Sequence, residues 1–128
     1  MRQNYEANSF LPSATRTATS SGILPRNTGH RGIIIKVDVT AIGAPAGNIS
    51  KIEIQIKVGD NFKTVYQWSG LTINAVDQYV FLLYPAAASA GQWTAAPLQG
   101  TLPINSKIVI THDDANSLTY SVAAEYLG

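Results

Sequence analysis

Aliphatic and polar residues alternate with a period of two along the middle of the chain. Residues 33–40 read IIIKVDVT and residues 51–58 read KIEIQIKV. A β-strand places alternate residues on one face, whereas a helix would scatter them around its circumference. The pattern therefore predicts two strands. In the second, it predicts that Ile52, Ile54, Ile56 and Val58 face one core and that Lys51, Glu53, Gln55 and Lys57 face away.

Turn-forming residues separate these segments from further predicted strands. Gly59-Asp60-Asn61 predicts a tight turn, and residues 62–68 then return as the second strand of a hairpin. The turn-forming stretch 113–117 predicts a second hairpin, between strands at 104–112 and 118–127. Residues 78–84 are apolar on both faces, which indicates a central strand buried on both sides or covered by a neighbouring subunit.

Six or seven such strands without an amphipathic helix favour an all-β fold, a single antiparallel β-sandwich of Greek-key or jelly-roll-like type. We expect this domain to span residues 31–128. Residues 1–30 are rich in Ser, Thr, Asn and Arg and contain Pro12 and Pro25, and we interpret them as an extended N-terminal arm. The alternative is that the arm folds back and adds an edge strand through residues 14–20.

A long connection at residues 85–103 contains three prolines and many small residues, and residues 86–90 have the composition of one helical turn. Trp93 lies in its middle. An aromatic side chain in such a segment needs a pocket, so Trp93 either pins the loop to its own domain or anchors a partner.

The composition adds a surface that is polar but weakly charged. Charged residues make up 13% of the 128 residues, and the net charge is +1, whereas about 25% is typical. Such a surface suits extensive contact with other protein, although an ordinary Ser- and Thr-rich β-domain would also produce it. Cysteine is absent, which excludes disulfides and thiolate metal sites. We find neither a signal-peptide pattern nor an apolar run of about 18 residues, so we expect no membrane partner.

The residues with possible chemistry do not form a catalytic pattern. His112-Asp113-Asp114 is the best candidate for a metal site, but only His112 and Asp114 would share a strand face, and the acidic pair also suits a solvated turn. No Gly-x-Ser-x-Gly elbow or phosphate-binding loop is present. We therefore expect neither an enzyme nor a cofactor. Sugar binding by Trp68 or Trp93 stays open, with core packing as the alternative for Trp68.

Four arginines lie within the first 31 residues, Arg2, Arg16, Arg26 and Arg31, opposed there only by Glu6. This local excess of positive charge suits either a solvated terminus or docking on an acidic protein surface, while nucleic-acid binding is less favoured.

Six segments follow one another in a recognisable order, residues 14–19, 30–33, 36–41, 83–85, 102–103 and 111–122. This order resembles a family of small virion structural proteins of tailed bacteriophages, of the capsid decoration or cement type. The chain departs from the family pattern in a shorter turn at residues 59–62 and in an insertion of small residues at 86–96.

The resemblance implies a protein of the virion, assembled in the host cytoplasm, that binds the major capsid protein or another virion protein. A tail, neck or fibre component with a carbohydrate-binding β-sandwich is the alternative. Low charge and the two-sided apolar strand predict a homo-oligomer, and the three-fold positions of capsids favour a trimer. As residues that bind partner proteins we expect Arg16, Arg26, Arg31, Tyr84 and Trp93.

Overall fold

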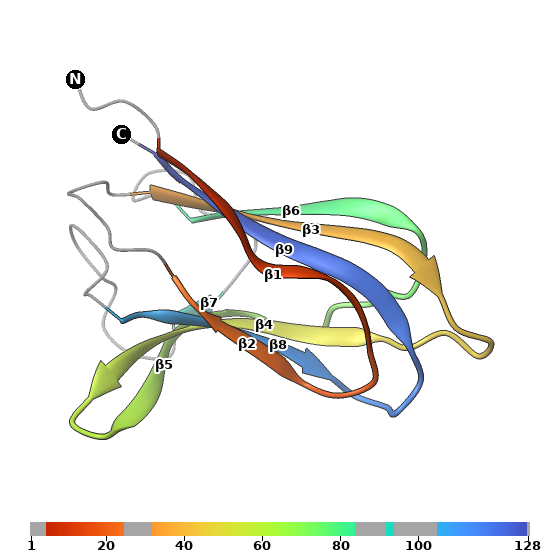
Figure 1. Cartoon of the computed structure of the whole chain (residues 1–128). Coiled ribbons are helices and arrows are strands. Elements are labelled where there is room, and N and C mark those ends of the chain that lie inside the picture. The colour runs from red at the N-terminus through yellow and green to blue at the C-terminus, as the bar shows by residue number, and fades with distance from the viewer. Residues whose placement is uncertain (1–4, 25–31, 84–91, 94–104, 128) are drawn as a thin grey trace.

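The computed structural model describes residues 5–24, 32–83, 92–93 and 105–127, with the backbone alone at 5–10 and 92–93. These residues form two packed layers of β-strands, with no helix among them (Figure 1). In chain order the strands are β1 (Tyr5–Arg16), β2 (Ser20–Ile23), β3 (Gly32–Ile42), β4 (Ile49–Val58), β5 (Asn61–Trp68), β6 (Asp77–Leu83), β7 (Gln92–Trp93), β8 (Lys107–His112) and β9 (Leu118–Leu127).

The strand order is that of a jelly roll. One sheet has the order β1-β9-β3-β6 and the other β2-β8-β4-β5-β7, and every strand pair is antiparallel. Apart from the hairpin β4–β5, successive strands lie in different sheets or, for β7 and β8, apart in one sheet. The predicted all-β sandwich of Greek-key or jelly-roll-like type is therefore confirmed.

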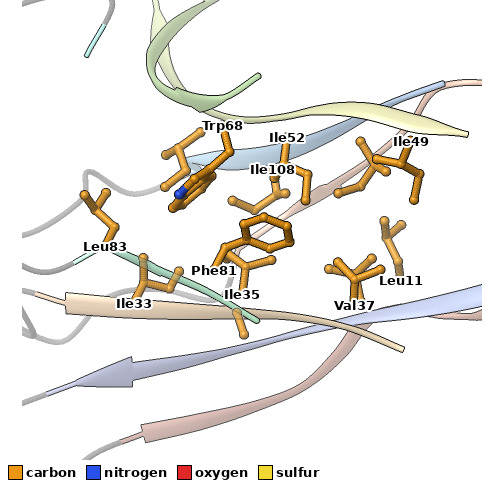
Figure 2. Close-up of a cluster of buried hydrophobic side chains, with 14 of the residues drawn as sticks. Leu11, Ile33, Ile35, Val37, Ile49, Ile52, Trp68, Phe81, Leu83 and Ile108 are labelled. Atoms are coloured by element: carbon orange, nitrogen blue, oxygen red, sulfur yellow. The ribbon is translucent and has the colours of Figure 1, made fainter. Parts of the chain in front are cut away.

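The core lies between the two sheets and is made by the predicted alternating positions. Ile33, Ile35, Val37 and Val39 of β3 are all buried, and they face the aliphatic residues of β4 and β8 across the interior (Figure 2). Trp68 of β5 is also buried, and its ring lies 5.4 Å from that of Phe81 in the opposite sheet. Trp68 thus belongs to the core, which removes it as a surface platform for sugars.

The predicted hairpin of β4 and β5 is present, with Val58 paired to Asn61 and Gly59-Asp60 as the turn. Gly59 has a φ of 64°, a left-handed conformation that glycine adopts without a Cβ penalty. The predicted burial is wrong at the end of the stripe. Ile52 and Ile54 are buried and Ile56 is partly buried, but Val58 is 54% exposed, because the hairpin extends beyond the core (Figure 1).

The predicted hairpin of β8 and β9 is not formed. β8 pairs with β2 and β4 in one sheet, whereas β9 pairs with β1 and β3 in the other. Residues 113–117 therefore cross between the layers. A hairpin and a sheet-to-sheet crossover need the same turn-forming residues, so the sequence pattern did not distinguish them.

The strand at residues 78–84 is not central. Among the described strands β6 pairs with β3 alone and forms the edge of its sheet, with Val80 62% exposed. Phe81 and Leu83 point into the core, while Val80 lies on the opposite face. The sequence of β6 is apolar on both faces because this exposed valine and adjacent apolar residues occupy the outer face. The outer face itself is not buried.

The boundary predicted at residue 30 is corrected as well. β1 pairs with β9, β2 pairs with β8, and the side chains of Leu11 and Leu24 are buried, so residues 5–24 belong to the sandwich. Pro12 lies within the second register shift of β1, between Leu11 and Ala14, at the edge of the sheet, where a missing N–H costs no ladder hydrogen bond. The folded-back alternative is the correct one, although it consists of two strands rather than one.

Candidate functional site

A hydrogen-bonded chain of polar side chains closes one end of the core. Nε2 of His112, at the end of β8, lies 2.8 Å from the hydroxyl of Tyr120 on β9. The same hydroxyl lies 2.7 Å from Oγ of Ser20, the first residue of β2. His112 and Tyr120 lie two residues from buried aliphatic residues of their strands and so share the inner face with them, which aims both side chains into the interior.

Arg16 covers this cluster from the end of β1. Its guanidinium carbon lies 4.6 Å from the centre of the Tyr120 ring, a cation–π contact. The guanidinium also donates hydrogen bonds to three backbone carbonyls, those of Pro12, Ala14 and Tyr120. Arg16 therefore ties β1 to β9, and its donors are engaged within the chain.

Burial controls the protonation of this cluster. Burial lowers the pKa of the His112 imidazole, Asp114 opposes the shift, Arg16 adds to it, and Asp113 opposes it. Burial raises the pKa of Tyr120, against the opposing effects of the Ser20 hydrogen bond and the Arg16 charge. Nδ1 of His112 is buried without a hydrogen-bond partner in the described part of the chain. The neutral imidazole is therefore the favoured form of His112 in the folded protein.

The cluster joins strands of the two sheets. In the residues that the structure describes, no three His, Asp or Glu side chains come close enough to hold a metal ion. Asp113 accepts a hydrogen bond from the Asn48 side chain, and Asp114 accepts one from the backbone N–H of Asn116. The His-Asp-Asp sequence thus divides into a buried histidine and two exposed turn residues, which agrees with its interpretation as a turn.

A groove of about 290 Å³ lies on the outer face of the sheet β1-β9-β3-β6. Ser121 and Ala123 of β9 contribute small side chains, and β3 contributes Lys36 and Asp38. Gln78 and Val80 of β6 line it as well. Lys36 also forms an ion pair of 3.0 Å with Glu125. The groove therefore combines apolar side chains with hydrogen-bonding groups, of which one is positively charged and one is negatively charged.

Exposed aliphatic side chains gather at the edges and ends of the sandwich. Val80 lies on the edge strand β6, and Val58 lies at the tip of the β4–β5 hairpin. Ile42 ends β3 and Val76 directly precedes β6, so both lie at the opposite end from the hairpin tip. Single exposed aliphatic residues are common on proteins, and a partner protein that covered an edge or an end of the sandwich would bury these.

Of the five residues predicted to bind partner proteins, the structure describes Arg16 and the backbone of Trp93. Arg16 has the intramolecular role described above, and the backbone of Trp93 pairs with that of Tyr66 at the edge of the sheet. That pairing attaches the segment to its own domain. Arg26, Arg31 and Tyr84 lie outside the described residues, as do residues 86–90. Partner binding by these five residues stays a prediction.

Two features of the surface and the core were not predicted from the sequence, the Ser20–Tyr120–His112 chain and the charge of the hairpin tip. Alternation placed Tyr120 on one strand face, but nothing in the sequence indicated that Ser20, a hundred residues earlier, lies beside it. Lys57 and Lys63 lie on either side of the predicted turn, and this spacing is the sequence signal that indicates a cationic tip.

Comparisons with known proteins give no relationship for this chain. No family model matches it, and no curated protein or solved structure shows a significant similarity. No helix among the described residues has the length and hydropathy needed to cross a membrane. The fold and the surface are therefore the grounds on which a function is proposed.

Proposed function

We propose that this chain is a non-enzymatic structural protein of a tailed-phage virion, of the capsid decoration or cement type, that binds the major capsid protein lattice. The resemblance in the order of its segments supplies the identity of the particle. The observation that carries the proposal further is the jelly-roll strand order, because double-sheet jelly rolls recur in viral capsid domains. This is an argument by analogy of fold.

The surface supports an assembly role independently of the fold. A protein that attaches to a particle needs area for burial against its neighbours, and exposed aliphatic residues on strand edges and ends provide it. Val80 and Val58 are two such residues, on an edge strand and a hairpin tip. The low content of charged residues reduces the cost of removing this surface from water.

The direct test is the location of the protein in purified particles. Electron microscopy of particles made with and without the gene should show added density of this size on the capsid surface, at a fixed symmetry position. Density at the tail or neck would contradict the capsid assignment while keeping a virion role. Complete absence of the protein from purified particles would contradict the proposal.

A carbohydrate-binding component of a tail, neck or fibre is the second candidate, and the groove favours it. Jelly rolls also occur in lectins. Lys36, Asp38, Gln78 and Ser121 offer donors and acceptors of the kind that bind sugar hydroxyls. A glycan array discriminates the two candidates, because a decoration protein should bind no glycan. Loss of a glycan signal on Gln78→Ala would locate the binding in the groove.

A further inference from the structure

Two exposed patches of opposite charge lie on this molecule, each with aliphatic residues. The hairpin patch consists of Lys57, Val58, Asp60 and Lys63, around the turn between β4 and β5. The crossover patch, so called because β8 crosses to β9 there, consists of Ile42, Val76, Asp77, Asp113 and Asp114. All nine side chains are exposed.

The strand directions place these patches at opposite ends of the sandwich. At the start of β4, Ile49 pairs with His112, whereas near its end Gln55 pairs with Lys107, so β4 leads away from the crossover between β8 and β9. Ile42 pairs with Leu118, and Asp77 with Val39, which brings the members of the crossover patch to one end. A strand of this length spans about 30 Å, so the two patches of one molecule do not meet (Figure 1).

The hairpin patch offers an aliphatic side chain beside positive charge. Ile56 pairs with Lys63 and Val58 with Asn61, so Val58 and Lys63 share a face of the hairpin. Lys57 pairs with Phe62 on the other face, where the ammonium of Lys107 lies 4.1 Å from the centre of the Phe62 ring. Within the described chain, neither Lys57 nor Lys63 has an ion pair.

The crossover patch offers the complement, two large aliphatic side chains beside three carboxylates. Val76 is 59% exposed and Ile42 is 47% exposed. Among the described residues no ion pair is found to Asp77, Asp113 or Asp114. The three carboxylates of this patch therefore have no ion-pair partner within the described chain.

We propose that the hairpin patch of one copy docks on the crossover patch of a second copy, in a head-to-tail contact. The inference rests on the proposed function in naming one partner of an assembly protein, a second copy of the same chain. The contact would bury Val58 against Ile42 and Val76 and place Lys63, which shares the hairpin face of Val58, opposite the aspartates, while Lys57 on the other face adds positive charge at the tip. Because the contact joins two different surfaces, repeated copies close into a ring if the rotation between successive copies permits, and otherwise they extend as a filament.

Sedimentation velocity of the full chain over a range of concentrations and salt tests this contact. We expect reversible self-association that weakens as salt rises, because exposed charge pairs are screened. Lys57→Glu with Lys63→Glu should weaken the association about tenfold or more, since like charges then face each other. Asp77→Lys with Asp113→Lys should have the same effect at the other patch. Thermal melting of both variants, whose changes lie at exposed positions, verifies that they fold.

An equal mixture of the two variants is the decisive measurement. In the mixture the reversed hairpin patch of one variant faces the reversed crossover patch of the other, and both contacts regain opposite charges. We therefore expect the mixture to associate while each variant alone does not, and because the two variants must alternate, a closed ring in the mixture holds an even number of copies. As a control, Ser13→Glu with Ser21→Glu adds negative charge at exposed positions of β1 and β2, outside both patches, and should leave the association unchanged.

A parent protein that stays monomeric at every concentration and salt would overturn the inference, as would variants that associate like the parent or a mixture that does not recover. Binding of a short DNA duplex by a monomeric parent, lost in the lysine variant, would assign the hairpin patch to nucleic acid instead. Presence in purified particles is measured separately. A monomer that is found in particles would contradict the contact alone, and an oligomer absent from them would contradict the proposed function alone.

Discussion

The hydroxyl of Tyr120 lies 2.8 Å from Nε2 of His112, and the two residues belong to opposite sheets of the sandwich. This bond links the layers at the end of the core where β8 crosses to β9. Ser20 extends the link to β2 through the same hydroxyl. The hydrogen bonds among Ser20, Tyr120 and His112 therefore connect three strands.

Stability should decrease as the pH falls below the ordinary pKa of histidine, about 6.5. The folded state lowers the pKa of His112, chiefly by burial, so below that pH the unfolded chain binds the proton more readily than the folded one. The contribution is complete above the unfolded pKa and is lost as the pH falls towards the folded pKa. Urea titrations of the parent and of His112→Gln measure the free energy of unfolding between pH 7 and pH 5, and this free energy should fall less steeply with decreasing pH in the variant. Equal slopes of free energy against pH would show that His112 is not the cause.

Tyr120→Phe should destabilise the fold by about 1–3 kcal/mol, because it leaves the buried His112 ring without its hydrogen-bond partner. Ser20→Ala is the control, since Ser20 is half-buried and its loss leaves the bond between Tyr120 and His112 in place. It should cost less than Tyr120→Phe. Equilibrium unfolding in urea measures both. If Ser20→Ala lowered the free energy of unfolding more than Tyr120→Phe, the bond between Tyr120 and His112 would not be the more important of the two.

Ile54→Asp should unfold the domain, because it places an unpaired charge in the core. Val58→Asp, four residues along the same stripe, should change stability by no more than about 0.5 kcal/mol, since its side chain is exposed. Thermal unfolding of the two variants compares identical substitutions at a buried and an exposed position. Similar melting temperatures for the two would show that the core extends into the hairpin.

Leu24→Ala should cost about 2–5 kcal/mol, the range for truncating a buried leucine. Its neighbour Ile23 is exposed, so Ile23→Ala should be nearly neutral. A truncation that starts at residue 28 removes β1 and β2 and should lower the melting temperature sharply, because β9 and β8 each lose an edge partner. A truncated protein that melts like the parent would restore the interpretation of residues 1–30 as a separate arm.

The alternating residues of β3, β4 and β9 were predictable because a strand that buries one face must repeat its aliphatic side chains every second position. The sequence by itself thus determined the fold class, the β4–β5 hairpin and most of the core. Its information is local, however. It identified residues 113–117 as a chain reversal and did not indicate whether β9 returns beside β8 or crosses to the other sheet.

Tertiary structure alone decided which distant segments meet. β1 has two register shifts and weak alternation, so its strand character depends on the hydrogen-bonding edge that β9 offers rather than on its own sequence. The meeting of Ser20 with Tyr120, the exposure of Val58 and the edge position of β6 likewise follow from the packing of the two sheets. Where the core ends and which strand lies at an edge are properties of the assembled layers, and no local pattern of side chains encodes them.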